Sequence, residues 1–300
     1  MTEKIGLAIL GGDQRQIAMA RRLASYGYGV YVWGLGRCES RIGEAIALSC
    51  WQEAVERASA VILPLPASAD GVRVHCPLQD SDVLLRMTTL LDAMSGRLLL
   101  GGRLTESIRS IAEQKQIEAI DYFDSEVLQL KNALPTAEGA IALAMHELPV
   151  TISGTHAAVI GYGRIGVLLA EKLQALGAEV TVYARRQEQL ALAELHRHTA
   201  KRIVCREGRS VPVDIGQDQR VIFNTVPQWL LTREVLQKLP ADCVLIDLAS
   251  APGGIDAAAA KELGLRYVWG TSLPGKCAPE TAGDILAETV AGILKDRDPN

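Results

Sequence analysis

The stretch GYGRIG at positions 161–166 decides the fold that this sequence predicts. It follows an apolar run, AAVI at 157–160, of the kind that forms a buried strand. It precedes a helical pattern with apolar residues three or four positions apart, which stops at Gly177, and a second strand, EVTVY at 179–183. Residues 155–186 therefore read as one strand–turn–helix–strand unit, and this context makes a weak glycine pattern a strong one.

Each glycine of this turn has a physical role. Gly161 permits the tight turn, Gly163 lets a diphosphate approach the backbone, and Gly166 lets helix and strand pack closely. The diphosphate would lie at the helix N-terminus, where free N–H groups and the positive end of the helix dipole attract it.

The end of the second strand indicates which dinucleotide binds. NAD enzymes usually carry an acidic residue roughly twenty residues beyond the glycines, whereas this chain has Arg185 and Arg186. Two guanidiniums suit a 2′-phosphate, so we predict NADP. The alternative is a surface arginine pair beside a structural glycine turn.

Two later strands, at 220–223 and 244–246, also end where a dinucleotide lies in such a sheet. We therefore expect these residues to contact the cofactor: Gly161, Tyr162, Gly163, Arg164, Ile165, Gly166, Arg185, Arg186, Thr225, Val226, Pro227 and Asp247.

Composition narrows the class of protein. A chain of 300 residues with 48% hydrophobic residues predicts two domains. A net charge of -4 with dispersed Lys and Arg argues against a nucleic-acid partner, and no apolar run is long enough to span a membrane. The six cysteines form no C-x-x-C pair, and the opening residues lead into a strand rather than a signal peptide, so we expect a cytoplasmic protein. His196 and His198 lie two apart on an expected helix and cannot share a face, so no metal is expected.

The N-terminal region repeats the alternation of strand and helix. A strand at 5–10 runs into GGDQRQ at 11–16, which lacks the third glycine of a dinucleotide turn. The fold class predicted is α/β, with two Rossmann-like, doubly wound parallel-sheet domains and a cleft between them. The Gly-Gly turn offers Asp13 and Arg15 to a ligand, and the alternative is a capped turn with solvated charges. Arg103, like Arg15, lies just past a strand, and both could bind carboxylates.

We expect a substrate domain at 1–132, an interdomain helix at 133–150, an NADP domain at 151–278 and a C-terminal helix at 279–300 that packs on the first domain. Thr136 is the expected N-cap of the interdomain helix, and Glu138 is either a catalytic base or a first-turn acid. The loop at 272–283 offers Lys276 to an anion and Thr281 as a cap, unless the loop is purely structural.

Four motifs together resemble the A-type subunit family of the dipicolinate synthases of spore-forming bacteria. They are GGDxRQ at 11–16, PTAEGA at 135–140, the glycine turn at 161–166, and LPGKxAPxTAG at 273–283. The resemblance implies oxidation of dihydrodipicolinate to dipicolinate with NADP in the mother-cell cytoplasm, with the separate B-type subunit of dipicolinate synthase as partner. It leaves homo-oligomerisation open.

More distantly the layout is similar to D-2-hydroxyacid and alanine dehydrogenases. The hydroxyacid enzymes carry a catalytic histidine in a PHxAG turn, where this chain has PETAG at 279–283. This departure argues against oxidation of a 2-hydroxyacid.

These considerations assign the substrate site. Candidate catalytic residues are Glu138, Lys276 and Arg15, with Glu280 as a second candidate base. Candidate substrate-binding residues are Asp13, Arg15, Arg103, Thr136, Lys276 and Thr281. Two other functions stay open: an NADP-dependent reductase of another keto or imino acid, and a nucleotide-binding regulatory or scaffold subunit.

Overall fold

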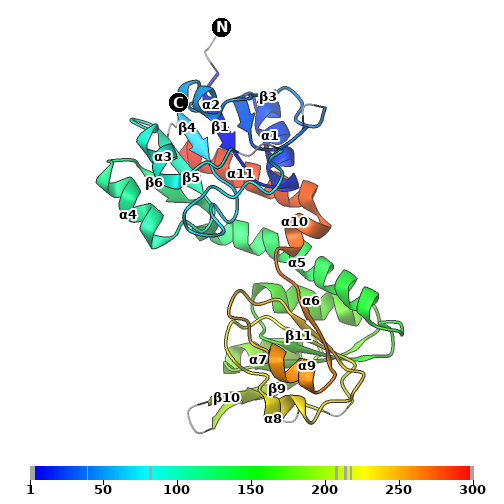
Figure 1. The fold of residues 1–300 in the computed structure, drawn as a ribbon. Coiled ribbons are helices and arrows are strands. Elements are labelled where there is room, and N and C mark those ends of the chain that lie inside the picture. Colours follow the sequence, from blue (N-terminus) through cyan, green and yellow to red (C-terminus); the bar gives the residue numbers. More distant parts are fainter. Residues whose placement is uncertain are drawn as a thin grey trace. The chain divides into compact units, whose positions relative to one another are not determined.

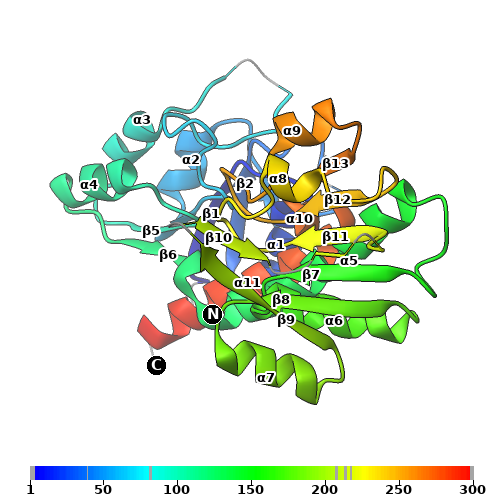
Figure 2. The same cartoon turned by 90° about the horizontal axis from the view of Figure 1, so that it is seen from below.

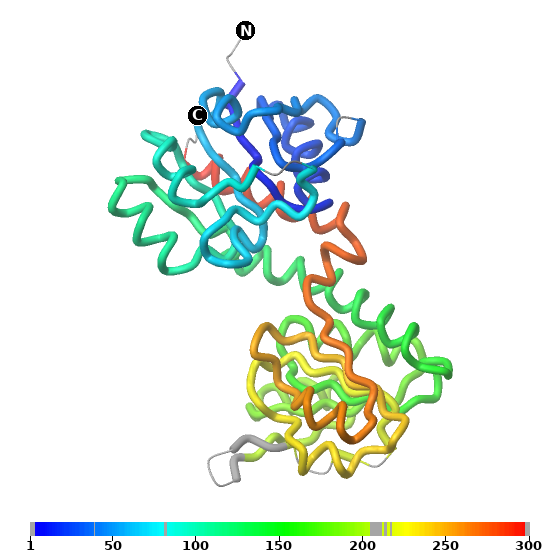
Figure 3. The backbone as a smooth tube through the Cα atoms, in the orientation of Figure 1, coloured from blue at the N-terminus to red at the C-terminus, as the bar shows by residue number. Residues whose placement is uncertain are grey.

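The computed structural model describes residues 4–38, 40–80, 83–206, 209–212, 215–216 and 218–297. The chain divides into two units, Met1–Asn132 with Ala278–Asn300, and Ala133–Cys277. One boundary lies inside helix α5 (Glu126–Glu147) and the other follows helix α10 (Leu273–Cys277). Figure 3 traces this path, with the C-terminal segment in red.

The first unit is built on a six-stranded sheet in the order β3-β2-β1-β4-β5-β6. Every neighbouring pair is parallel, and the order is that of a doubly wound dinucleotide fold. The strands are β1 (Gly6–Leu10), β2 (Gly29–Trp33), β3 (Ile46–Ala47), β4 (Ala60–Ile62), β5 (Leu98–Gly101) and β6 (Ala119–Asp121).

Helices cover both faces of this sheet, because alternate strand residues point to opposite sides. Leu7 and Ile9 of β1 belong to the core under α1 and α11, whereas Ala8 and Leu10 belong to the core under α2, α3 and α4. The elements are α1 (Gln14–Ser25), α2 (Trp51–Glu56), α3 (Met87–Asp92), α4 (Glu106–Gln114), the 3₁₀ turn η1 (Tyr122–Asp124) and α11 (Pro279–Arg297). Helix α11 lies against α1 so closely that a Cβ at Gly283 would overlap the carbonyl oxygen of Arg15 (Figure 1).

The second unit has a seven-stranded sheet in the order β10-β9-β8-β7-β11-β12-β13. All pairs are parallel except β9 with β10, an antiparallel edge strand that the sequence did not predict. The strands are β7 (His156–Ile160), β8 (Glu179–Ala184), β9 (Thr199–Arg206), β10 (Arg209–Pro212), β11 (Val221–Asn224), β12 (Val244–Asp247) and β13 (Arg266–Trp269). The prediction of two doubly wound sheets is confirmed.

The two faces of this sheet are also covered. Helices α5, α6 and α7 pack on one core, and α8 and α9 pack on the other, as Figure 2 shows for α6 and α7 against α8 and α9. These helices are α6 (Arg164–Ala175), α7 (Gln187–Leu195), α8 (Arg233–Leu236) and α9 (Ala257–Glu262). Among the described residues, none of the helices combines the length and the apolar character needed to cross a bilayer.

Two local predictions are wrong. Helix α5 begins at Glu126, so Thr136 lies inside it rather than at its N-cap, and Pro135 is also internal. Burial of Ala133, Ala137 and Ala140 outweighs the helix-breaking tendency of the proline. The expected loop at 272–283 is also helical, because α10 and the first turn of α11 occupy it, and Thr281 is inside α11 rather than its cap.

Candidate functional site

A cavity of about 260 Å³ lies at the carboxyl ends of the central strands of the second unit. It is beside β7, where the strand order reverses, which is the position at which this fold binds dinucleotides. The lining residues are Gly161, Tyr162, Gly163, Ala184, Arg185, Arg186, Gln189, Ile203, Thr225, Val226, Pro227, Gln228 and Leu230.

The three glycines have the geometry that a diphosphate-binding turn requires. Gly161 has φ +92°, and a Cβ there would overlap the hydroxyl oxygen of Thr225. A Cβ at Gly166 would overlap the carbonyl oxygen of Gly161, so α6 could not pack against the turn. In contrast, a Cβ at Gly163 would meet no described atom within 4 Å. The turn is therefore tight on its inner side and open at Gly163.

The first turn of α6 faces this open side. Gly163 is the N-cap, and among the described residues no side chain caps the helix. Its first N–H groups are thus suited to an anion. Arg164 is exposed and Ile165 is half-buried, and neither lines the cavity.

Arg185 and Arg186 follow the last residue of β8 and line the cavity. Both side chains are exposed, and neither forms an ion pair with a described residue. The structure therefore brings two guanidiniums that no described residue neutralises to the same cavity as the glycine turn.

Tyr162 holds the turn in place rather than offering its hydroxyl to a ligand. It is 2% exposed, its hydroxyl is 2.9 Å from Nδ1 of His196, and its carbonyl oxygen accepts a hydrogen bond from Gln189 Nε2 at 3.0 Å. Burial and, to a smaller extent, the charge of Glu171 raise the pKa of Tyr162 to about 12, so the phenol is neutral.

The two histidines near Tyr162 are arranged differently from the prediction. Helix α7 ends at Leu195, so His196 and His198 lie beyond it on a turn, with ring centroids 6.3 Å apart. His198 is 5% exposed, and both its ring nitrogens are buried without a hydrogen-bond partner among the described residues. Throughout the described residues, no three His, Cys, Asp or Glu side chains form a metal-binding group.

The segment after β11 forms the wall opposite the turn. The hydroxyl of Thr225 donates to the carbonyl of Ile160 at 2.9 Å, which ties the segment to the end of β7. The side chain of Asn224 bonds both the carbonyl and the N–H of Val226, at 3.0 and 3.2 Å. The sequence analysis missed Asn224, although a polar residue ending an apolar strand is a visible signal.

Asp247 supports this wall from beneath and does not line the cavity. It is 0% exposed, and its Oδ1 accepts a hydrogen bond from Asn224 Nδ2 at 2.8 Å. The N–H groups of Ala249 and Gly254 donate to its two oxygens at 3.1 and 2.8 Å. The structure thus gives Asp247 a place behind Asn224, where it cannot touch a ligand in the cavity, instead of the direct cofactor contact expected.

In the first unit, Asp13 and Arg15 bind each other. Asp13 is the N-cap of α1, and its carboxylate accepts hydrogen bonds from Arg15 Nε at 2.9 Å and Nη2 at 2.8 Å. Nη2 also donates to the carbonyl of Leu65 at 2.5 Å. Burial would raise the pKa of Asp13, but the hydrogen bonds and charge of Arg15 outweigh it and hold the pKa below 3.8. Arg15 is 5% exposed, and only Nη1 takes part in none of these bonds.

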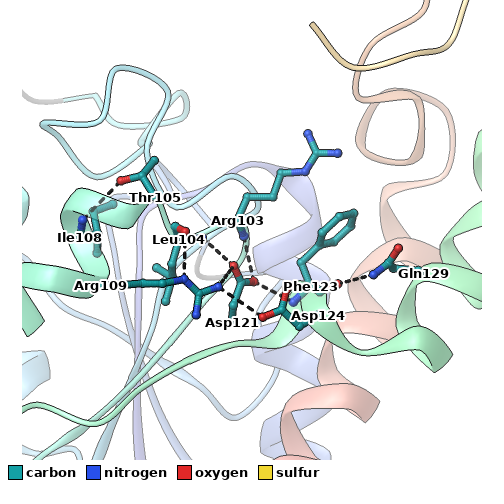
Figure 4. A network of polar contacts seen from close by, with 9 residues as sticks. All are labelled: Arg103, Leu104, Thr105, Ile108, Arg109, Asp121, Phe123, Asp124 and Gln129. Carbon is teal, nitrogen blue, oxygen red and sulfur yellow. Dashed lines mark hydrogen bonds and ion pairs between the residues drawn. The ribbon is translucent and has the colours of Figure 1, made fainter. Parts of the chain in front are cut away.

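Of the two arginines expected to bind carboxylates, Arg15 and Arg103, only Arg103 has a guanidinium that no described carboxylate binds. It follows the carboxyl end of β5. It is exposed, and its guanidinium carbon lies 4.8 Å from the centre of the Phe123 ring. Its N–H donates to Asp121 at 3.0 Å, while its side chain points away from that carboxylate (Figure 4). No described carboxylate pairs with the guanidinium, so Arg103 is available to an anion.

The remaining predicted residues lie on three helices. Glu138 on α5 is paired with Lys172 at 3.0 Å, and Glu280 on α11 is paired with Arg21 and Arg41. Thr136 is buried in α5, Thr281 is exposed on α11, and Lys276 is exposed on α10. Thr136, Glu138 and Lys276 thus belong to the second unit, and Glu280 and Thr281 to the first.

His75 is a residue that the sequence analysis missed. Its carbonyl accepts a hydrogen bond from the Gly12 N–H at 2.8 Å, which brings this loop to the turn that carries Asp13. Burial lowers the pKa of His75 below 6.5, and the charge of Asp13 opposes this in part. The contact joins segments far apart in the chain, so no local pattern could have revealed it.

Two family models match consecutive parts of the chain. The family model for the N-terminal domain of the A-type dipicolinate synthase subunit matches residues 6–123, and that of the D-isomer specific 2-hydroxyacid dehydrogenase NAD-binding domain matches residues 129–253. The A-type dipicolinate synthase subunit of Bacillus subtilis (strain 168) is 28% identical over 302 residues, which cover 99% of this chain and 98% of that protein. This chain is similar, over nearly its whole length, to the A-type subunit of dipicolinate synthase.

Solved structures extend the relationship to the corresponding dipicolinate synthase subunit of Bacillus halodurans. Its crystal structure matches with a TM-score of 0.85 and 27% identity over 97% of each chain. An L-alanine dehydrogenase matches with a TM-score of 0.62 and 14% identity over 97% of this chain and 90% of its own, which shows a shared fold alone. The resemblance drawn from the motifs is confirmed, and these matches support an oxidoreductase with a nicotinamide dinucleotide cofactor.

Proposed function

We propose that this chain oxidises dihydrodipicolinate to dipicolinate (pyridine-2,6-dicarboxylate) with NADP as the hydride acceptor. The relationship to the A-type dipicolinate synthase subunits, over nearly the whole of both chains, supports the substrate. The observation that carries the choice of NADP is the pair of guanidiniums, Arg185 and Arg186, which line the cavity of the glycine turn and which no described residue neutralises. By the same relationship we propose the B-type subunit of dipicolinate synthase as partner, and a role in the mother-cell cytoplasm during sporulation.

The residues of the cavity fit this cofactor. Gly163 and the start of α6, which no described side chain caps, would hold the diphosphate, and Arg185 and Arg186 would hold the 2′-phosphate. When bound, NADP⁺ supplies the hydride acceptor.

The substrate loses a hydride from one ring carbon and a proton from its neighbour. The electron pair of the second C–H bond then completes the aromatic ring, so atoms and charge balance. The chain has to hold two carboxylates and accept one proton. Arg103 is the best placed carboxylate receptor, because no described residue neutralises it. Nη1 of Arg15, in the same unit, is the candidate for the second carboxylate.

The proton acceptor we propose is His75 rather than Glu138 or Glu280. Both carboxylates are held in ion pairs with Lys or Arg. The imidazole of His75 is half-buried and makes no hydrogen bond with a described residue. Because its pKa is lowered, the ring is neutral and able to accept a proton near pH 7.

This assignment predicts the pH dependence of the reaction. The rate constant kcat/KM should fall as the pH drops through the lowered pKa of His75, because protonation removes the base. A His75→Asn variant should lose most of the rate together with this acid limb. The exposed His146→Asn variant, which makes the same change on α5, is the control. An unchanged acid limb in His75→Asn would exclude His75 as the base.

The proposed function is tested with the purified chain, freshly made dihydrodipicolinate, and either NADP⁺ or NAD⁺. We expect one dipicolinate per NADPH formed and much slower turnover with NAD⁺. Consumption of NADPH with a keto or imino acid, without dipicolinate, would instead favour a reductase.

A regulatory or scaffold role is the other alternative. It predicts binding of NADPH but no turnover by this chain in any form. The same assay repeated in the presence of the partner, and with Arg103→Ala in the complex, separates the two cases. If kcat/KM of the complex, measured below saturation with dihydrodipicolinate and NADP⁺, is unchanged both with that variant and with an Arg185→Ala/Arg186→Ala chain, the chemistry belongs to the partner.

A further inference from the structure

The carboxyl ends of β5 and β6 are joined by a single buried carboxylate. The side chain of Asp121 is 4% exposed. It accepts hydrogen bonds from the N–H groups of Arg103 at 3.0 Å, Leu104 at 2.7 Å and Phe123 at 2.9 Å, and from Arg109 Nη2 at 3.0 Å. Figure 4 shows these bonds converging on Asp121 from both segments. One residue thus sets the backbone that carries Arg103 and the backbone that carries the Phe123 ring.

The backbone at Arg103 is in an unusual conformation. Its φ of +54° lies in the left-handed region, which residues other than glycine seldom adopt. Such conformations persist where the surroundings hold them, and they gather at ligand-binding sites. Here the surroundings are the bonds from Arg103 and Leu104 to Asp121.

The two arginines of this network have different roles. Arg109 is bound to Asp121, to Asp124 at 3.3 Å and to the carbonyl of Leu104 at 3.3 Å, so its charge neutralises the buried carboxylate. Arg103 gives only its backbone N–H to Asp121, and its guanidinium lies on the Phe123 ring. A guanidinium over the face of a ring is held by a cation–π contact, which uses none of its N–H groups, so these remain for a planar, bidentate partner such as a carboxylate.

We propose that Asp121 is the positioning residue of a carboxylate-binding site formed by Arg103 on the Phe123 ring. This inference rests on the proposed function, because it assigns one carboxylate of the ring dicarboxylate to Arg103. Asp121 does not touch the substrate. It acts by holding Arg103 in the left-handed conformation and by fixing the ring against which the guanidinium lies.

A double-mutant cycle tests the inference. Arg103→Ala and Asp121→Asn should each raise KM for dihydrodipicolinate about 10- to 100-fold, the range for a lost hydrogen bond between charged groups, with kcat and NADPH affinity nearly unchanged. The double variant should be no worse than Arg103→Ala, since Asp121 acts through Arg103. A further loss in the double variant equal to that of Asp121→Asn alone would overturn the proposal.

Two more variants keep the test decisive if Asp121→Asn does not fold. Phe123→Leu leaves the backbone bond to Asp121 and removes the ring, so KM should rise about 2- to 5-fold, the range for an exposed cation–π contact. Arg57→Ala is the matched control, because Arg57 also lies over a ring, Tyr31, at 5.6 Å in the same unit. It should leave KM unchanged. An unchanged KM in Phe123→Leu, or a similar rise in the control, would count against the site.

Binding of the product separates this inference from the proposed function. Calorimetric titration with dipicolinate needs no turnover. If the wild type binds dipicolinate without oxidising dihydrodipicolinate, and Arg103→Ala weakens that binding, the site stands and the function falls. If the wild type oxidises dihydrodipicolinate and Arg103→Ala has wild-type KM, only the site falls. If it does neither, both fall.

Discussion

Replacing Arg185 and Arg186 together by alanine should abolish the preference for NADPH over NADH. The two side chains line the cavity at the end of β8, where the ribose of a dinucleotide lies in this fold. NADH has no 2′-phosphate and makes no such contact with the two arginines, so its affinity should change less than about twofold, as for an ordinary surface substitution. The effect on NADPH is therefore a direct measure of the two guanidiniums.

The magnitude follows from the exposure of the arginines. A hydrogen bond to a charged group contributes about 1.5–3 kcal/mol. Both side chains are exposed, and salt screens their charges over about 8–10 Å, so each contact should contribute the lower end of this range. Two contacts then contribute about 3 kcal/mol, which corresponds to about 100-fold weaker NADPH binding at 1.36 kcal/mol per tenfold change.

The assay is calorimetric titration of the wild type and the double variant with NADPH and NADH at two salt concentrations. Arg233→Ala is the matched control, because Arg233 is an exposed arginine of the same unit that pairs with Glu262 and does not line the cavity. The salt dependence of NADPH binding should shrink in the double variant. Equal affinities of the wild type for both dinucleotides, or an unchanged preference in the double variant, would refute the reasoning.

Three further predictions concern the turn, the buried histidine and the strained arginine. Gly163→Val should weaken NADPH binding at least tenfold with little change in Tm, because a Cβ there meets only open space. Gly166→Ala should instead lower Tm by several degrees, because its Cβ overlaps the turn. Calorimetric titration measures the first effect and thermal unfolding the second. Burial, and secondly the charge of His196, lower the pKa of His198 in the folded state, so below pH 6.5 the unfolded chain binds a proton that the folded chain resists, and stability is lost as the pH falls. Urea unfolding should show this slope reduced in His198→Gln. Arg103→Gly should raise Tm by about 2–4 °C while raising KM, because relief of the positive φ exceeds the lost contact with Phe123 by about 1 kcal/mol; a fall in Tm would show that the conformation is not strained.

The support behind the dinucleotide cavity has a consequence for engineering this site. Asp247 and Asn224 are both 0% exposed and bind each other at 2.8 Å. Removing one partner leaves the other buried and unsatisfied, at a penalty of about 1–3 kcal/mol or more for the charged group. Changes of cofactor preference are therefore better made at Arg185 and Arg186, which are exposed, than at these strand ends.

The sequence by itself determined the features that depend on near neighbours. The glycine turn at 161–166, the helix that follows it and the arginines at the end of β8 lie within one strand–helix–strand unit. The start of α6 and the alternation of strands and helices follow from residues a few positions apart in the chain. Such signals are readable because local sterics and hydrophobic periodicity act over short stretches of chain.

Only the tertiary structure decided which charges are free. Arg15 and Arg103 both follow a strand in the sequence, yet Arg15 is buried and its guanidinium binds Asp13 and the carbonyl of Leu65. Arg103 donates only its backbone N–H to Asp121, and its guanidinium is exposed. The same holds for Asp247, which the sequence places at a ligand and the fold places in the core. The physical reason is that the partner of a charged side chain, and the water it loses, depend on segments brought together by folding, which no local pattern records.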